Sequence, residues 1–121
     1  MIYNEELANR IRAALVDHRE VEEKKMFGFL VFMVNGKMCL GVRGDEMLCR
    51  IGPDSMEALL RRGGCAPLRM KHRTSLRMIM VEESGMKTKN DFNFWINLAL
   101  ESNLGIGSNM NRNAKQRRSR D

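Results

Sequence analysis

The stretch that decides the fold is KKMFGFLVFMVNGKMCLGV, residues 24–42, in which eleven apolar residues surround one Asn35-Gly36 pair. Asn-Gly is the strongest short-range signal for a β-hairpin, because a type I′ turn needs positive φ at both of its central residues. The flanking segments FLVFMV and KMCLGV are rich in residues that favour strands. The stretch therefore predicts an antiparallel hairpin with Asn35-Gly36 at its tip.

A second tight turn follows at Gly44-Asp45, with Gly at the first central position, as a type II′ turn requires. The segment EMLCRI then predicts a third strand, so residues 25–51 are expected to form a three-stranded antiparallel meander. Alternation places Met38, Leu40 and Val42 on one face of the second strand. The first strand, residues 29–34, is apolar on both faces, so either a second helix or a partner chain must cover it.

Helices are predicted at both ends of the chain. Asn4 is a good N-cap, and apolar spacing predicts a helix over about residues 4–18. Thr88 has Asp91 three residues on and predicts the start of a last helix. The apolar face of that helix is wide and consists of Phe92, Trp95, Ile96, Ala99 and Leu100.

The middle of the chain predicts one more helix and two more strands. Gly52-Pro53-Asp54 predicts the helix start with Pro at the first helical position, and Gly63-Gly64 predicts its end. Strands are expected over 66–70, where Pro67 indicates a sheet edge, and over 75–82 before a break at Ser84-Gly85. The predicted order is α-β-β-β-α-β-β-α, an α+β domain with a five-stranded antiparallel sheet over residues 1–104.

The net charge of +6 is unevenly distributed. Residues 105–121 have no apolar periodicity and are predicted to form a flexible basic tail. This tail contains five of the 21 basic residues and one of the 15 acidic residues, so it carries +4. Its bases are Arg112, Lys115, Arg117, Arg118 and Arg120. The high net charge is therefore mostly a property of the tail.

The residue types that carry chemistry do not form a recognisable site. Cys39, Cys49 and Cys65 are odd in number and lack a Cys-x-x-Cys spacing, so reduced thiols are expected rather than disulfides or zinc. His18 and His72 are expected at the surface, as are the three Glu-Glu pairs. We therefore expect no catalytic residue, no cofactor and no metal. No apolar run approaches the roughly 20 residues that span a bilayer, so no membrane is expected.

Two features suggest binding, and each has an ordinary structural alternative. Arg69, Lys71, His72, Arg73 and Arg77 form a run without an acid between them, which either contacts phosphate or is simply a solvated hairpin. The chain also contains 11 methionines. Methionine fills irregular cores, but it also serves adaptable binding surfaces.

The motifs KKMFG, MVNGKMCLGV, DEMLCRIGP, MEALL and FWINLALES, taken together and in this order, resemble the N-terminal domain of the TfoX/Sxy family. The resemblance covers roughly residues 5–103. It departs from the family at Phe29, where the family often has a second glycine after Met-Phe-Gly.

This resemblance implies an α+β domain of the secretion chaperone-like kind and a cytoplasmic, non-enzymatic role. The family is named for regulators of bacterial natural competence, whose full-length members act with the cyclic-AMP receptor protein at promoters. Those members carry a second, C-terminal domain with helix-hairpin-helix character. The resemblance covers the N-terminal domain alone, so a standalone domain is expected.

Two functions from different classes follow. The first is a protein-interaction module of a transcriptional, competence-type regulator, which binds a protein partner or self-associates through a surface around Phe27 and Phe29. The second is a small nucleic-acid-binding protein that uses the basic tail together with Arg69, Lys71 and Arg73. Charge alone would give only non-specific, salt-dependent binding.

Overall fold

The computed structural model describes residues 3–18 and 20–105 of the 121-residue chain. The helices are α1 (Glu5–Ala14), α2 (Met56–Arg62), a short 3₁₀ helix η1 (Glu83–Met86) and α3 (Lys89–Asn103). The strands are β1 (Val21–Met26), β2 (Phe29–Val34), β3 (Lys37–Arg43), β4 (Glu46–Arg50), β5 (Cys65–Met70) and β6 (Arg73–Val81). From residue 106 onward, the predicted tail lies outside the described residues.

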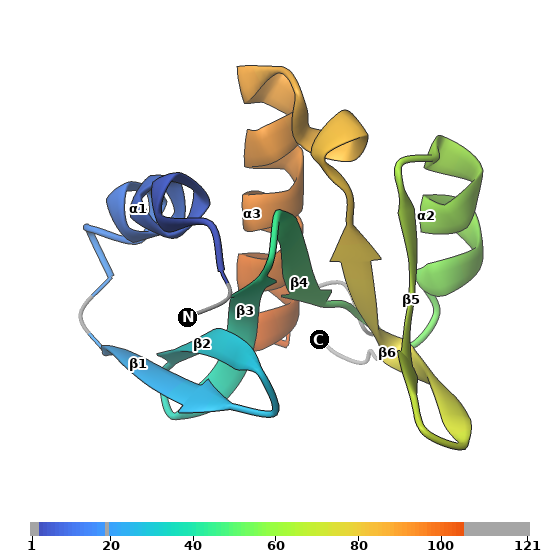
Figure 1. Ribbon diagram of the computed structural model, residues 1–121, viewed down its shortest axis with the longest axis horizontal. Helices are drawn as coiled ribbons and strands as arrows, with labels where there is room; N and C mark the ends of the chain where they lie inside the picture. Colours follow the sequence, from blue (N-terminus) through green and yellow to red (C-terminus); the bar gives the residue numbers. More distant parts are fainter. Residues whose placement is uncertain (1–2, 19, 106–121) are drawn as a thin grey trace.

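The six strands form one antiparallel sheet in the order β1-β2-β3-β4-β6-β5 (Figure 1). The buried side chains of α1, α2 and α3, such as Leu7, Leu59 and Trp95, belong to the same apolar cluster. All three helices therefore cover the same face of the sheet. The predicted α+β class and the antiparallel sheet are confirmed.

The predicted number of five strands is wrong, because β1 lies at the edge of the sheet beside β2. Four of its six residues are charged, so it shows no apolar alternation that would mark it as a strand. Charged side chains are usual on edge strands, where they oppose pairing with another chain. The observed order is α-β-β-β-β-α-β-β-α, with η1 before the last helix.

The helix caps follow the sequence closely, with two corrections to the helix bounds. The Asn4 side chain accepts the Leu7 N–H at 3.1 Å, and Thr88 Oγ1 accepts the Asp91 N–H at 3.0 Å. However, α1 ends at Ala14 rather than near residue 18. Pro53 is not the first helical residue, because α2 begins at Met56 with Ser55 as its N-cap.

A bulge in β3 overturns one predicted face. Phe32 pairs with Leu40, whereas the next residue of β2, Met33, pairs with Met38. Cys39 is therefore the extra residue, so it joins Leu40 on the helix-covered face and Met38 turns to the opposite face. The Cys39 thiol lies under α3 and donates to the carbonyl oxygen of Ala99 at 3.5 Å.

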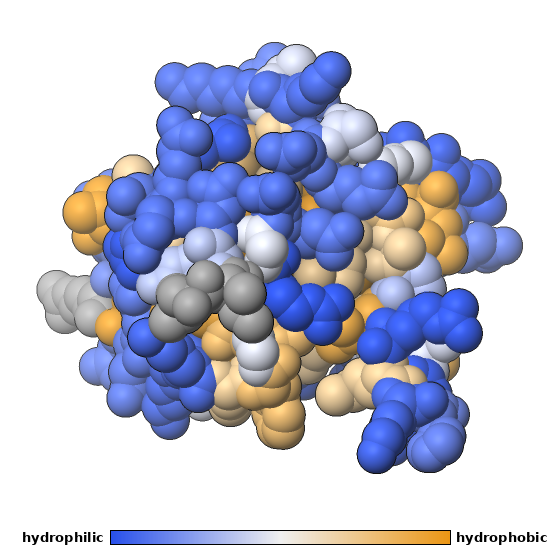
Figure 2. Space-filling model, in the orientation of Figure 1, coloured by the Kyte–Doolittle hydropathy of each residue, from blue (hydrophilic) through white to orange (hydrophobic). Residues whose placement is uncertain are grey.

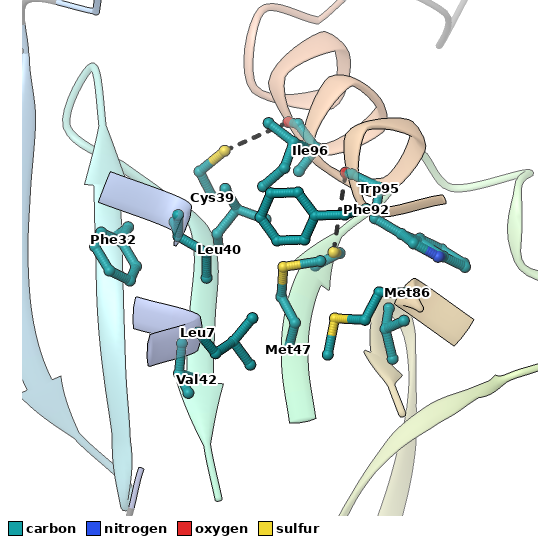
Figure 3. Packing of buried hydrophobic residues seen from close by; sticks show 14 of the residues in the cluster. Leu7, Phe32, Cys39, Leu40, Val42, Met47, Met86, Phe92, Trp95 and Ile96 are labelled. Atoms are coloured by element: carbon teal, nitrogen blue, oxygen red, sulfur yellow. Dashed lines mark hydrogen bonds between the residues drawn. The ribbon is translucent and has the colours of Figure 1, made fainter. Parts of the chain in front are cut away.

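The core lies between the sheet and the helices. Figure 3 shows Phe92, Trp95 and Ile96 of α3 against Leu40 and Met47 of the sheet. The predicted apolar face of α3 is confirmed, with Leu100 half-buried and its other four members buried.

The end of α3 holds the Asn35-Gly36 turn in place. Asn35 and Gly36 have φ of 54° and 78°, so the predicted type I′ turn is confirmed. Buried Asn103 donates from Nδ2 to the carbonyl oxygen of Val34 at 2.8 Å and accepts from Asn35 Nδ2 at 3.2 Å. Lys37 Nζ donates to the carbonyl oxygen of Asn103 at 3.2 Å. Sequence reasoning did not single out Asn103, because an Asn near a helix end is ordinary.

We expect Gly36→Val to lower the free energy of unfolding by about 1–2 kcal/mol, the cost of a left-handed backbone for an ordinary L-residue. No heavy atom lies within 4 Å of an added Cβ, so the loss comes from the backbone conformation alone. Urea unfolding measures it, with Thr74→Val at an exposed strand position as the control. Equal midpoints for the two variants would contradict the turn geometry.

Candidate functional site: an apolar groove on the uncovered face of the sheet

The face of the sheet opposite the helices is also apolar. A second buried cluster on this face consists of Phe29, Val31, Leu48, Leu68 and Met80. Half-buried methionines surround it, namely Met26, Met33, Met38 and Met78. No helix in the described part of the chain contributes to this cluster, so the sheet has two apolar faces and only one helical layer.

A groove of about 520 Å³ lies on this face. Strands β2 and β4 supply its floor, including Phe29, Val31 and Leu48. On one side it is bounded by Phe27 in the β1–β2 turn, and on the other by Met70 and Leu76 of the β5–β6 hairpin. Apolar surface is visible in the lower part of Figure 2, flanked by hydrophilic residues.

Exposed apolar side chains concentrate around this groove. Six large ones are well exposed in the described residues, and three of them line it: Phe27 at 79%, Leu76 at 69% and Met70 at 50%. Single exposed apolar residues are normal, but a group around a concave apolar surface is typical of a binding site. The groove is therefore the candidate functional site.

Phe27 combines exposure with an unfavourable backbone conformation. It has φ of 55°, in the left-handed region that costs an ordinary residue about 1–2 kcal/mol. Neither burial nor local preference accounts for an aromatic residue here. Phe29, two residues on, is buried in the floor, and the Arg43 guanidinium lies 4.7 Å from its ring centroid. The two residues predicted as a partner surface thus lie at the edge and in the floor of one groove.

Basic side chains complete the groove. Arg50, Arg73 and Arg77 line it, and no acidic residue is among the described residues that do so. Arg73 and Arg77 belong to the run noted in the sequence, whereas Arg50 comes from β4 and was missed. The strand pattern did indicate its position. Arg50 is two residues after Leu48 in β4, so the two side chains lie on the same face of the sheet.

Two of the other predicted nucleic-acid contacts, Arg69 and Lys71, do not line the groove. Arg69 and Lys71 are exposed at the tip of the β5–β6 hairpin, beside His72, around a separate hollow of about 580 Å³. The tail bases Arg112, Lys115, Arg117, Arg118 and Arg120 lie outside the described residues. Of the three predicted basic contacts that the structure describes, Arg73 is the one that lines the groove.

The methionines divide between the two alternatives raised by the sequence. Met47 and Met86 are buried in the core under the helices. Met38, Met70 and Met78 line the groove. Because methionine is unbranched and polarizable, this part of the groove can adapt to the shape of what it contacts.

A bend in β6 shapes one side of the groove. Pro67 of β5 pairs with Ile79, but Arg69 pairs with Thr74, so β6 carries extra residues between these points. The Ser75 hydroxyl oxygen accepts the backbone N–H groups of both Arg77 and Met78, each at 3.1 Å. The Ser75 side chain therefore satisfies two backbone donors within the bend.

The thiols lie away from the groove and are unreactive in character. Burial raises the pKa of Cys39 to about 12 and raises the pKa of Cys49 well above its ordinary value. Burial also raises the pKa of half-buried Cys65, whose thiol donates to the carbonyl oxygen of Leu59 at 3.2 Å.

Within residues 3–18 and 20–105, no three His, Cys, Asp or Glu side chains are grouped to hold a metal ion. None of the described helices combines the length and apolar character needed to cross a membrane.

Comparison with known proteins places the groove within a shared domain. The chain matches the model of the TfoX N-terminal domain over residues 13–103, which includes every strand and every residue that lines the groove. Searches of curated proteins and of solved structures each found no match. The expected likeness to secretion chaperone folds thus stays a prediction. The chain belongs to the TfoX N-terminal domain family.

Proposed function

We propose that this chain is a non-enzymatic protein-interaction module of a transcriptional, competence-type regulator, and that the groove is its docking surface. One observation carries the proposal: an apolar sheet face has no helix over it among residues 3–18 and 20–105, and it is bordered by exposed Phe27 and Leu76. Membership of the TfoX N-terminal domain family supports the regulatory setting.

The energetics favour an occupant of this surface. Removing apolar surface from water contributes roughly 25 cal/mol per Å². A group of exposed side chains around a concave apolar floor therefore offers a large gain to any chain that covers it. Phe27 is a further sign of a binding role. It occupies a left-handed turn position that glycine or asparagine would adopt more easily, so its aromatic ring is not explained by the turn itself. A protein segment with its own apolar face is the natural occupant. The cytoplasm is the proposed location of the complex.

Site-specific photocrosslinking in the native host tests this proposal. A photoreactive phenylalanine analogue replaces Leu76 at the groove, and the matched control replaces Val16, which is 76% exposed in the turn after α1 and does not line the groove. We expect a discrete adduct with a transcription regulator from position 76 that survives nuclease treatment, and none from position 16. Equal labelling at both positions, or none at position 76, would contradict a docking groove.

The same experiment separates two other outcomes. An adduct of twice the chain mass would mean self-association through the groove. An adduct that nuclease removes would favour the nucleic-acid alternative, for which exposed Arg69, Lys71 and Arg73 on the β5–β6 hairpin are the structural support. Binding of that kind weakens steeply with salt, with a log–log slope of roughly −0.9 for each phosphate contacted on duplex DNA.

A further inference from the structure

We propose that the groove binds an acidic amphipathic α-helix of a protein partner. This inference rests on the proposed docking function and adds the chemistry of the segment that docks. Three features of the groove, within the part of the chain that the structure describes, support it: backbone groups in the bend of β6 are bonded, no helix covers this face of the sheet, and the arginines that line the groove have no carboxylate partners.

The bend of β6 beside the groove has backbone groups that are already bonded and so not available to an added strand. In the bend of β6, Ser75 accepts the N–H groups of Arg77 and Met78, and the carbonyl oxygen of Arg77 accepts the Ile51 N–H at 2.8 Å. The two free edges of the sheet are also protected against strand addition. Charged residues fill the β1 edge, and Pro67 lies in the β5 edge. A partner must therefore recognise side chains, and a helix laid in a groove does so.

The opposite face shows what this sheet accepts. Helices α1 and α3 cover it through residues such as Ile11 and Ile96, which pack on the inner side chains of β2 and β3. A sheet that is apolar on both faces is normally covered on both. A helix from another chain would supply the layer that the described residues do not. The volume of about 520 Å³ has room for a few large side chains of its apolar stripe.

The charges specify the polar part of that helix. Three other described arginines pair with carboxylates, namely Arg12 with Glu23 at 2.7 Å, Arg62 with Asp91 at 3.0 Å and Arg61 with Glu57 at 3.7 Å. Among the described residues, none provides an ion pair or a side-chain hydrogen bond to the guanidinium groups of Arg50, Arg73 or Arg77. Guanidinium groups bind carboxylates in a bidentate manner, and more strongly beside apolar surface than in open water. Glu or Asp side chains that flank the apolar stripe of a helix would therefore pair with the guanidinium groups of these three arginines.

Fluorescence anisotropy with two designed peptides tests the inference on the full chain. The first peptide is a helix of about 15 residues with leucines at i, i+3, i+4 and i+7 and glutamates on the flanks. In the second, every glutamate is replaced by lysine. We expect the acidic peptide to bind about tenfold tighter or more, with the ratio falling as salt is added.

Three variants complete the test. Arg77→Glu should weaken the acidic peptide about tenfold and strengthen the basic one, whereas Leu76→Ser should weaken both. Arg61→Glu reverses a charge on exposed α2, away from the groove, and should change neither. All three substitutions are at exposed positions, so the variants are expected to fold. Their melting temperatures are measured as the check on folding.

The outcomes separate this inference from the function on which it rests. Equal binding of the two peptides, binding of neither, or no effect of Arg77→Glu would overturn the acidic helix. If crosslinking at position 76 still captures a regulator, the docking function stands and only the chemistry of its partner is wrong. If position 76 captures nothing, both proposals fail.

Discussion

Replacing Trp95 with Ala is expected to lower the free energy of unfolding by about 3–5 kcal/mol, the range for large aromatic truncations in protein cores. Trp95 is fully buried at the centre of α3. Its ring meets that of Phe94 edge-on, with centroids 5.2 Å apart, and Nε1 donates to the carbonyl oxygen of Gly85 at 3.1 Å. The truncation therefore opens a cavity and also leaves a carbonyl without its donor.

Urea unfolding followed by circular dichroism measures this loss, and Trp95→Phe is the matched control. Phenylalanine keeps most of the apolar volume but cannot donate to Gly85, so a smaller loss is expected. The difference between the two variants estimates the contribution of ring volume. An unchanged unfolding midpoint for Trp95→Ala would mean that α3 is peripheral to the core rather than its main helix.

Short local signals predicted much of this fold. Asn35-Gly36 and Gly44-Asp45 specify their turns because each turn type demands a particular sign of φ, and Gly44 indeed has φ of 59°. The caps at Asn4 and Thr88 are equally local, since each side chain accepts an N–H three residues away. Such features depend on a few neighbouring residues, so they can be predicted without knowing the rest of the chain.

The features that could not be predicted depend on contacts between distant residues. β1 is a strand because it pairs with β2 at the sheet edge, although its own residues are mostly charged. The bulge at Cys39 breaks a regular alternation, and its thiol lies under Ala99, sixty residues later in the chain. No periodicity in either segment carries that information.

The candidate site could be predicted only in part, because one side of it follows from a local pattern and the other from the folded sheet. An apolar pattern on both faces of β2 indicated an uncovered surface, and Phe27 and Phe29 lie in the groove. The other side of the groove depends on the bend that Ser75 stabilises in β6, which brings Leu76 and Arg77 opposite Phe27. A bend of that kind follows from hydrogen bonds within the folded sheet, so the sequence alone did not reveal the groove or its arginines.

Gly85→Ala is expected to destabilise the chain by about 1–3 kcal/mol, the usual cost of overpacking a filled interior. An added Cβ would overlap the carbonyl oxygen of Gly64 and lie 3.0 Å from its carbonyl carbon. Both are backbone atoms, so no side chain can rotate away to make room. The Gly64 oxygen also accepts the Glu82 N–H at 2.9 Å, so the contact joins the end of α2 to the start of η1.

The displacement should reach the core through Trp95, because Nε1 of that residue is bonded to the carbonyl oxygen of Gly85. Trp95 is the single tryptophan of the chain, so its fluorescence reports directly on this contact. We expect a lower melting temperature together with a red-shifted emission for Gly85→Ala. Ser84→Ala, at the exposed neighbouring residue of η1, should alter neither. If the two variants melt alike, the close Gly64–Gly85 contact does not hold the end of α2 against η1.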